Sequence, residues 1–206
     1  MENVAYENKK YTYEDLEKLP QDERYEIING DLFVMESPHG RHQLILGELF
    51  GQIREYLQGK KCTVFLSPFD VALAKINKKS EIYNVVQPDL FVLCDMNKYE
   101  GPKVFGGPEF VIEIASPTNR AHDYYRKLNL YQEYGVKEYW IVDPIEKNIH
   151  PYVLNEKGVY ELSKVYALDE DIKVKTLKGL TISLKEFLEQ NKDLLKEDEA
   201  EYKLED

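Results

Sequence analysis

The chain has 206 residues and a formal net charge of -11, with 38 acidic and 27 basic side chains. It contains no run approaching the roughly 18 to 20 apolar residues that span a bilayer, and its N-terminus lacks the apolar stretch of a secretory signal. We therefore expect no membrane segment and a cytoplasmic location. The acidic balance counts against simple electrostatic attraction to nucleic acid, although part of the excess lies in the last residues, 196–206.

The apolar and aromatic content, with 16 tyrosines and 8 phenylalanines, is sufficient for a folded core. We expect a single domain over 11–192, preceded by an N-terminal extension at 1–10 and followed by an acidic C-terminal tail at 193–206. The two cysteines, Cys62 and Cys94, show no CxxC spacing. Buried free thiols are therefore expected rather than a disulfide or a thiolate zinc site.

The N-terminal part is predicted to begin with a short helix over 11–19. Thr12 is a suitable N-cap with an acid three residues later, and a proline ends the segment. Strands at 25–28 and 32–35 then flank the turn sequence Asn29-Gly30-Asp31, in which the glycine permits a positive φ. This pattern indicates a β-hairpin.

Helical spacing of apolar residues is clearest over 42–57, and Gly59 follows the end of that segment. Beyond it, apolar and β-favouring segments predict strands at 63–66, 71–74, 85–94, 109–115 and 138–142. The central segments are nearly continuous apolar runs, as in strands buried on both faces. Helices must therefore cover both faces of the sheet.

A helix predicted over 121–134 lies between the strands at 109–115 and 138–142 and is ended by a glycine. This strand-helix-strand order is typical of an α/β fold with a central mixed sheet. The stretch 150–174 is predicted to form a C-terminal β meander, and 184–195 a closing helix.

Two of the apolar runs carry an acidic residue. Asp89 follows Pro88 at the start of one run, and Glu113 lies inside another. An ionised carboxylate among Leu, Phe, Val and Ile is costly to bury unless a metal or a lysine compensates it. Because Mg²⁺ binds one or two carboxylates and keeps waters for phosphate chemistry, the pattern indicates a metal-dependent site for phosphodiester hydrolysis. A structural salt bridge is the alternative.

Lys127 adds a cation on the predicted helix, four residues after Asp123, so that both lie on one helical face. An ordinary ion pair between them, worth about 0.3 to 0.5 kcal/mol, is the simpler interpretation if the helix is taken alone. Beside two strand carboxylates, a catalytic lysine is the favoured interpretation.

These motifs resemble the PD-(D/E)XK, or restriction-endonuclease-like, superfamily and, within it, the Uma-type restriction endonuclease family. The likeness runs from about residue 11 to 190. Its matching segments are at 25–30, 87–90, 108–117, 123–127 and 131–143, of which the last, containing GVKEYWIVD, is the most distinctive. The resemblance implies a restriction-endonuclease-like central mixed β-sheet flanked by helices, to which this chain would add its N-terminal hairpin and its C-terminal β meander.

The resemblance also implies a magnesium or manganese ion held by Asp89, Glu113 and the main-chain carbonyl of Ile114. The superfamily's lysine normally follows the acid by two residues, where this chain has Ala115. Uma-type sequences look like cases in which the lysine has moved to the following helix, and Lys127 is the matching position. A Lys127 that pointed to solvent would leave the site without its water-orienting cation.

Other polar residues near these motifs have two interpretations each. Glu26 looks like the upstream acid that many superfamily members add as a metal ligand, or else it pairs with Arg24 or a lysine. His39 and His42 precede the long helix, where His42 would contact phosphate or act as an acid; a structural histidine is more common at such a position. Ser116 either orients the site or caps the following helix, and the cap is favoured.

Two further features would suit contact with DNA. Aromatic side chains that could stack on bases cluster in the second half of the chain; they are Tyr124, Tyr125, Tyr131, Tyr134, Tyr139 and Trp140. Their helical or strand spacing beside apolar residues favours packing in the core instead. Lys75, Lys78 and Lys79 form a compact basic run on a predicted loop, where solvation is the default interpretation.

We therefore expect an endonuclease that hydrolyses phosphodiester bonds in DNA with Mg²⁺ or Mn²⁺, using Asp89, Glu113, Lys127 and Glu26. The alternative is a catalytically inactive nuclease-fold protein that acts as a binding or interaction module, which the acidic surface and Ala115 favour. A hydrolase of another phosphoester is a third interpretation. A homodimer would suit two cuts in a duplex.

Overall fold

The computed structural model describes residues 9–20, 22–116 and 122–194. Its centre is a mixed sheet with the strand order β11-β10-β9-β8-β6-β3, in which β12 also pairs with β10. Parallel pairing joins β8 to β9, and antiparallel pairing joins β6 to β8. The strands are β3 (Thr63–Leu66), β6 (Leu90–Leu93), β8 (Phe110–Ile114), β9 (Glu138–Asp143), β10 (Asn148–Leu154), β11 (Tyr160–Leu162) and β12 (Tyr166–Ala167). The predicted α/β fold with a central mixed sheet is confirmed.

A smaller sheet has the strand order β2-β1-β5-β4-β7. The predicted hairpin forms its edge, and Asn29 and Gly30 both adopt positive φ values, of 53° and 79°, as a tight hairpin turn requires. The strands are β1 (Arg24–Ile28), β2 (Asp31–Met35), β4 (Asp70–Ala72), β5 (Val85–Val86) and β7 (Lys103–Phe105). Of these, β7 had no counterpart among the predicted strands.

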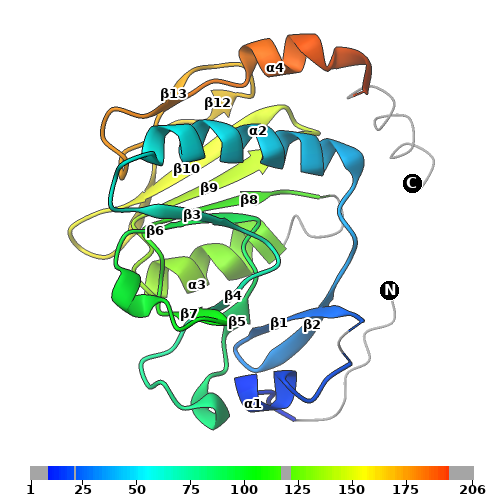
Figure 1. Cartoon of the computed structure of the whole chain (residues 1–206), viewed down its shortest axis with the longest axis vertical. Helices are drawn as coiled ribbons and strands as arrows, with labels where there is room; N and C mark the ends of the chain where they lie inside the picture. The colour runs from blue at the N-terminus through cyan, green and yellow to red at the C-terminus, as the bar shows by residue number, and fades with distance from the viewer. Residues whose placement is uncertain (1–8, 21, 117–121, 195–206) are drawn as a thin grey trace.

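Helices and the small sheet sandwich the central sheet (Figure 1). On one face lies the long predicted helix α2 (Gly40–Leu57), accompanied by α4 (Lys185–Gln190) and by the short strand pair β13 (Ile172–Lys173) and β14 (Thr181–Ile182). The other face packs against α3 (Leu128–Glu133) and the small sheet. The short helix α1 (Tyr13–Leu16) packs beside the small sheet, and its N-cap is Thr12, as predicted.

The alternation of side chains along β8 divides them between two cores. Phe110, Ile112 and Ile114 pack into the core under α2, whereas Val111 packs into the core shared with α3. Glu113 has the same parity as Val111 and is buried, with 3% of its surface exposed. The strand therefore places a carboxylate on its α3-facing side, inside the protein.

Two predicted elements are divided in the structure. The segment 85–94 is not one strand, because Pro88 has no N–H for sheet pairing; the chain leaves the small sheet after Val86 and enters the central sheet at Leu90. The predicted helix at 121–134 consists of a π-helix over His122–Lys127 followed by α3. The residues expected to start that helix lie outside the described part of the chain.

The aromatic and lysine clusters mostly take the simpler of their two roles. Tyr131, Tyr139 and Trp140 are fully buried, which confirms core packing, but that prediction is wrong for Tyr125, which is 70% exposed. In the basic run, Lys78 pairs with Glu81 and Lys79 with Glu17, each lysine at an exposed position.

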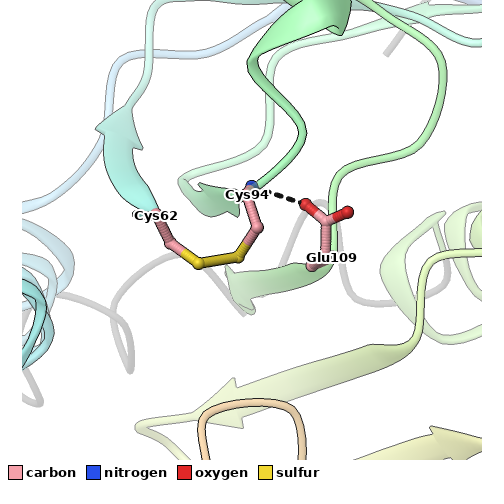
Figure 2. Close-up of a disulfide and its surroundings, with 3 residues drawn as sticks. All are labelled: Cys62, Cys94 and Glu109. Carbon is pink, nitrogen blue, oxygen red and sulfur yellow. Dashed lines mark hydrogen bonds between the residues drawn. A yellow bond between two sulfur atoms is a disulfide. The ribbon is translucent and has the colours of Figure 1, made fainter. Parts of the chain in front are cut away.

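The prediction of free thiols is wrong. Cys62 and Cys94 form a disulfide (Figure 2). The two cysteines flank the antiparallel pair Thr63 and Leu93 of β3 and β6, so the register brings them directly opposite one another. The main-chain N–H of Cys94 also donates a hydrogen bond to the Glu109 carboxylate, 2.7 Å away. Cysteine spacing in the sequence could not show this, because it depends on the strand register.

Within the described residues, no helix combines the length and the apolar character that crossing a membrane requires. The division into an extension at 1–10, a domain at 11–192 and a tail at 193–206 stays a prediction.

We expect the double substitution Cys62→Ser/Cys94→Ser to lower the free energy of unfolding by about 2 to 4 kcal/mol, because the crosslink restricts the unfolded chain. Urea unfolding followed by circular dichroism measures the change. A reducing agent should lower the stability of the wild type to that of the double variant and leave the variant unaffected. Equal stability of oxidised wild type and double variant would contradict a stabilising disulfide.

Candidate active site

A cavity of about 90 Å³ lies at one end of two inner strands of the central sheet, where β6 begins and β8 ends. Residues from the end of β2, the start of α2 and the turn after β9 complete its walls. Asp89, Glu113 and Lys127 all line this cavity, as do Ile114 and Ser116. The structure therefore brings together residues that are up to 38 positions apart (127 minus 89) in the sequence.

Asp89 is held at the cavity by one of its two carboxylate oxygens. Oδ2 accepts a hydrogen bond from the main-chain N–H of Ile114 at 2.8 Å and lies 2.9 Å from Nε2 of His42. No described residue donates a hydrogen bond to Oδ1. Within the described part of the chain, Oδ2 thus fixes the orientation of the carboxylate, and Oδ1 is the oxygen that a ligand could contact.

Glu113 is held from the α3 side. Its Oε1 accepts hydrogen bonds from Lys127 Nζ at 2.9 Å and from the Tyr131 hydroxyl at 2.7 Å. Among the described residues, its Oε2 accepts only a long hydrogen bond, of 3.3 Å, from the main-chain N–H of Asp89. Burial raises the pKa of Glu113 to about 7; the charges of Asp89 and Glu26 act in the same direction, and Lys127 and Tyr131 oppose them.

Lys127 points into the protein and not to solvent. It ends the π-helix, is 4% exposed, and its Nζ lies 2.9 Å from Glu113 Oε1 and 3.1 Å from Glu26 Oε1. The predicted ion pair between Asp123 and Lys127 assumed the i, i+4 spacing of an α-helix, whereas both residues lie in a π-helix. The side chain of Asp123 lies outside the described residues. Single π turns are frequent at functional sites.

Glu26 lies behind Lys127 and does not line the cavity. It is buried on β1, where its Oε1 also accepts a hydrogen bond from the main-chain N–H of Gln87 at 2.8 Å. Of the two interpretations of Glu26, the structure shows the pairing with a lysine. Arg24 instead donates hydrogen bonds to Ser67 and to the carbonyl of Glu36.

The start of α2 adds His39 and His42, both of which line the cavity. His39 is the N-cap residue, and its side chain makes no capping hydrogen bond. Nδ1 of His42 is buried and has no hydrogen-bond partner among the described residues. Ser116 also lines the cavity, and its predicted role as a helix cap stays a prediction, because residues 117–121 lie outside the described part of the chain.

Two contributors to the site were not singled out from the sequence. Tyr131 was assigned to the core, although it follows Lys127 by four residues and so shares its helical face; its hydroxyl proton is retained because burial raises its pKa. Gln87 adjoins the Pro88-Asp89 pair. Its Nε2 donates to Asp70, which extends the polar network into the small sheet.

The donor set fits a hard divalent cation. Glu26, Asp89 and Glu113 together carry up to three negative charges, and Lys127 carries one positive charge. The net charge of the four side chains is therefore as low as -2, which a cation would neutralise. In the described part of the chain, no three His, Cys, Asp or Glu side chains are arranged to hold a metal ion. Two carboxylates with one under-used oxygen each match Mg²⁺, which takes few protein ligands and retains water.

Three comparisons with known proteins bear on this site. The model of the Uma2 family, described as "Putative restriction endonuclease", matches residues 11–185. The "Uncharacterized protein slr1290" of Synechocystis sp. is 25% identical over 150 residues, which cover 72% of this chain and 76% of that protein. The crystal structure of a putative nuclease belonging to DUF820, from Anabaena variabilis, superposes with a TM-score of 0.68 at 20% identity, over 87% of this chain and 98% of that one. The last similarity establishes a shared fold.

The raised pKa of Glu113 predicts a dependence of stability on pH. The folded state holds this proton between the ordinary value of 4.5 and about 7, whereas the unfolded state releases it, so the stability contributed by Glu113 falls as pH rises through that window. In the presence of a chelator, the free energy of unfolding of wild type minus that of Glu113→Gln should therefore fall from pH 4.5 to pH 7. Urea unfolding of both proteins measures it.

The exposed substitution Glu133→Gln, on α3, is the matched control and should leave the difference independent of pH. A difference for Glu113→Gln that stays constant across the window would show that the carboxylate is ionised throughout.

Proposed function

The chain belongs to the Uma2 family, described as putative restriction endonucleases, and on that premise we propose that it is a Mg²⁺- or Mn²⁺-dependent endonuclease that hydrolyses phosphodiester bonds in DNA. One observation carries the proposal: the carboxylates of Asp89, directly before β6, and of Glu113 in β8 meet the buried Lys127 at one cavity. This combination would supply metal ligands and a fixed cation for a bound phosphate.

Asp89, Glu113 and the main-chain carbonyl of Ile114 would hold the metal ion. When bound, a divalent cation polarises a phosphoryl oxygen and lowers the pKa of bound water. His42 orients Asp89 through the contact with Oδ2, and Tyr131 orients Glu113. Substitution of a residue that hydrogen-bonds a metal-ligating carboxylate typically lowers metal affinity by about 10- to 100-fold.

Lys127 would stabilise the negative charge that develops on the phosphate and position the attacking water. Preorganised charges act strongly in a site from which water is largely excluded. Glu26 has an indirect role in this scheme, since it contacts Lys127 and does not line the cavity. It would fix the lysine side chain and would not ligate the metal.

The rival function is a nuclease-fold protein that binds a partner without catalysis. Its specific support is that Lys127 is already engaged by two carboxylates, as in an ordinary buried salt-bridge network. The fold does not separate the two functions, so metal binding and cleavage must.

Assembly and location are further proposals. A homodimer would place two cavities for cuts in both strands of a duplex. The second proposal is a cytoplasmic location, against which the Cys62–Cys94 disulfide counts, because disulfides persist mainly in oxidising compartments.

Calorimetric titration of Mn²⁺ tests the metal site without a substrate. We expect saturable binding to the wild type, loss of binding in Glu113→Gln because one of two carboxylate ligands is removed, and unchanged binding in the exposed control Glu133→Gln. Absence of binding to the wild type, both alone and in the presence of a DNA duplex, would favour the non-catalytic rival.

The role of Lys127 is tested by plasmid nicking with Mn²⁺. Lys127→Gln should lower the cleavage rate by about 100-fold or more, as expected for loss of a transition-state charge, while Mn²⁺ affinity is retained. Circular dichroism confirms folding, and the exposed Lys61→Gln serves as control. Cleavage by Lys127→Gln at the wild-type rate would remove the lysine from the mechanism.

A further inference from the structure

A second, larger cavity of about 520 Å³ adjoins the first. The start of α2, the turn between β9 and β10, the end of β12 and helix α4 enclose this groove, and Figure 1 shows the start of α2 and the end of α4 on the same side of the molecule. Arg41 and Pro144 line both cavities. The groove therefore lies next to the candidate active site.

The lining of the groove carries more basic than acidic side chains, in a protein that is strongly acidic overall. Two acidic side chains, Asp169 and Glu189, line the groove. The basic side chains that line it number four and are Arg41, Lys147, Lys185 and Lys192. Lys185 and Lys192 are exposed and form no ion pair with any other described residue. With a net charge of -11 on the chain, two exposed lysines on the lining of one groove are positioned for an anion from outside.

The floor of the groove is apolar. Five apolar residues from four segments form it; they are Ile45, Pro144, Ala167, Leu168 and Leu188. An apolar floor between cationic walls is complementary to a polymer that has apolar sugar and base faces and regularly spaced negative charges. A compact anion such as free phosphate would leave the floor without contacts.

We propose that this groove binds the sugar-phosphate backbone of the DNA segment next to the scissile bond, with Lys185 and Lys192 contacting phosphates. The proposal rests on the proposed endonuclease function, because it takes the first cavity as the place of cleavage. Electrostatic contacts of this kind position the substrate and carry no sequence information. They would also explain how an acidic protein binds DNA, through a local basic track.

The test compares Lys185→Gln/Lys192→Gln with the control Lys61→Gln/Lys157→Gln in the full-length protein. Both pairs of lysines are exposed and both double variants lose two positive charges, but Lys61 and Lys157 line neither cavity. Fluorescence anisotropy with a labelled DNA duplex, with Ca²⁺ as the metal, gives the affinity over a range of salt concentrations.

We expect the groove variant to reduce the slope of log affinity against log salt by about two, and to lose about 10-fold in affinity at low salt relative to the wild type. The control variant should match the wild type. Equal slopes for groove and control variants would overturn the proposal. A change in sedimentation of the groove variant with no change in slope would assign the groove to a second copy of this chain and would also overturn it.

Hydrolysis of bis-para-nitrophenyl phosphate with Mn²⁺ separates this proposal from the proposed function, because so small a diester needs only the first cavity. The groove variant should hydrolyse it at the wild-type rate. If wild type and groove variant differ in DNA binding but neither hydrolyses the diester or DNA, the groove assignment stands and the nuclease function fails. If both hydrolyse the diester and bind DNA with equal slopes, the nuclease function stands and the groove assignment fails.

Discussion

The buried ammonium of Lys127 is the interaction on which the site depends. It lies between Glu113 of the central sheet and Glu26 of the small sheet, so one cation joins two sheets that share no strand. Removing one partner from such a group leaves an uncompensated buried charge, which typically costs about 3 to 5 kcal/mol. The arrangement therefore couples the folding of the small sheet to the geometry of the cavity.

The short segment between β5 and β6 has a related role. Gln87 donates its main-chain N–H to Glu26, and two residues later Asp89 donates its own to Glu113. Because Pro88 prevents continuous strand pairing, the chain can turn from one sheet to the other within three residues. The acids on both sides of Lys127 are thus fixed by the same piece of backbone.

Much of this could be predicted from the sequence. The apolar runs and turn residues indicated the mixed sheet, the hairpin and α2, and resemblance identified Lys127 where spacing alone did not. Contacts that depend on strand register or on helix type could not be predicted: the Cys62–Cys94 disulfide, the hydrogen bond of Tyr131 to Glu113, and the π-helix that ends at Lys127. The sequence shows which residues are suited to such contacts, but only the three-dimensional fold decides which of them meet.

The disulfide has a consequence for association between molecules. It crosslinks β3, which lies at one edge of the central sheet, to β6, its only partner in that sheet within the described residues. Edge strands are where sheets of different molecules pair or exchange strands, and an exchanged β3 would have to leave β6. While the crosslink is intact, β3 cannot be donated to a neighbouring copy, so domain swapping at this edge is covalently blocked.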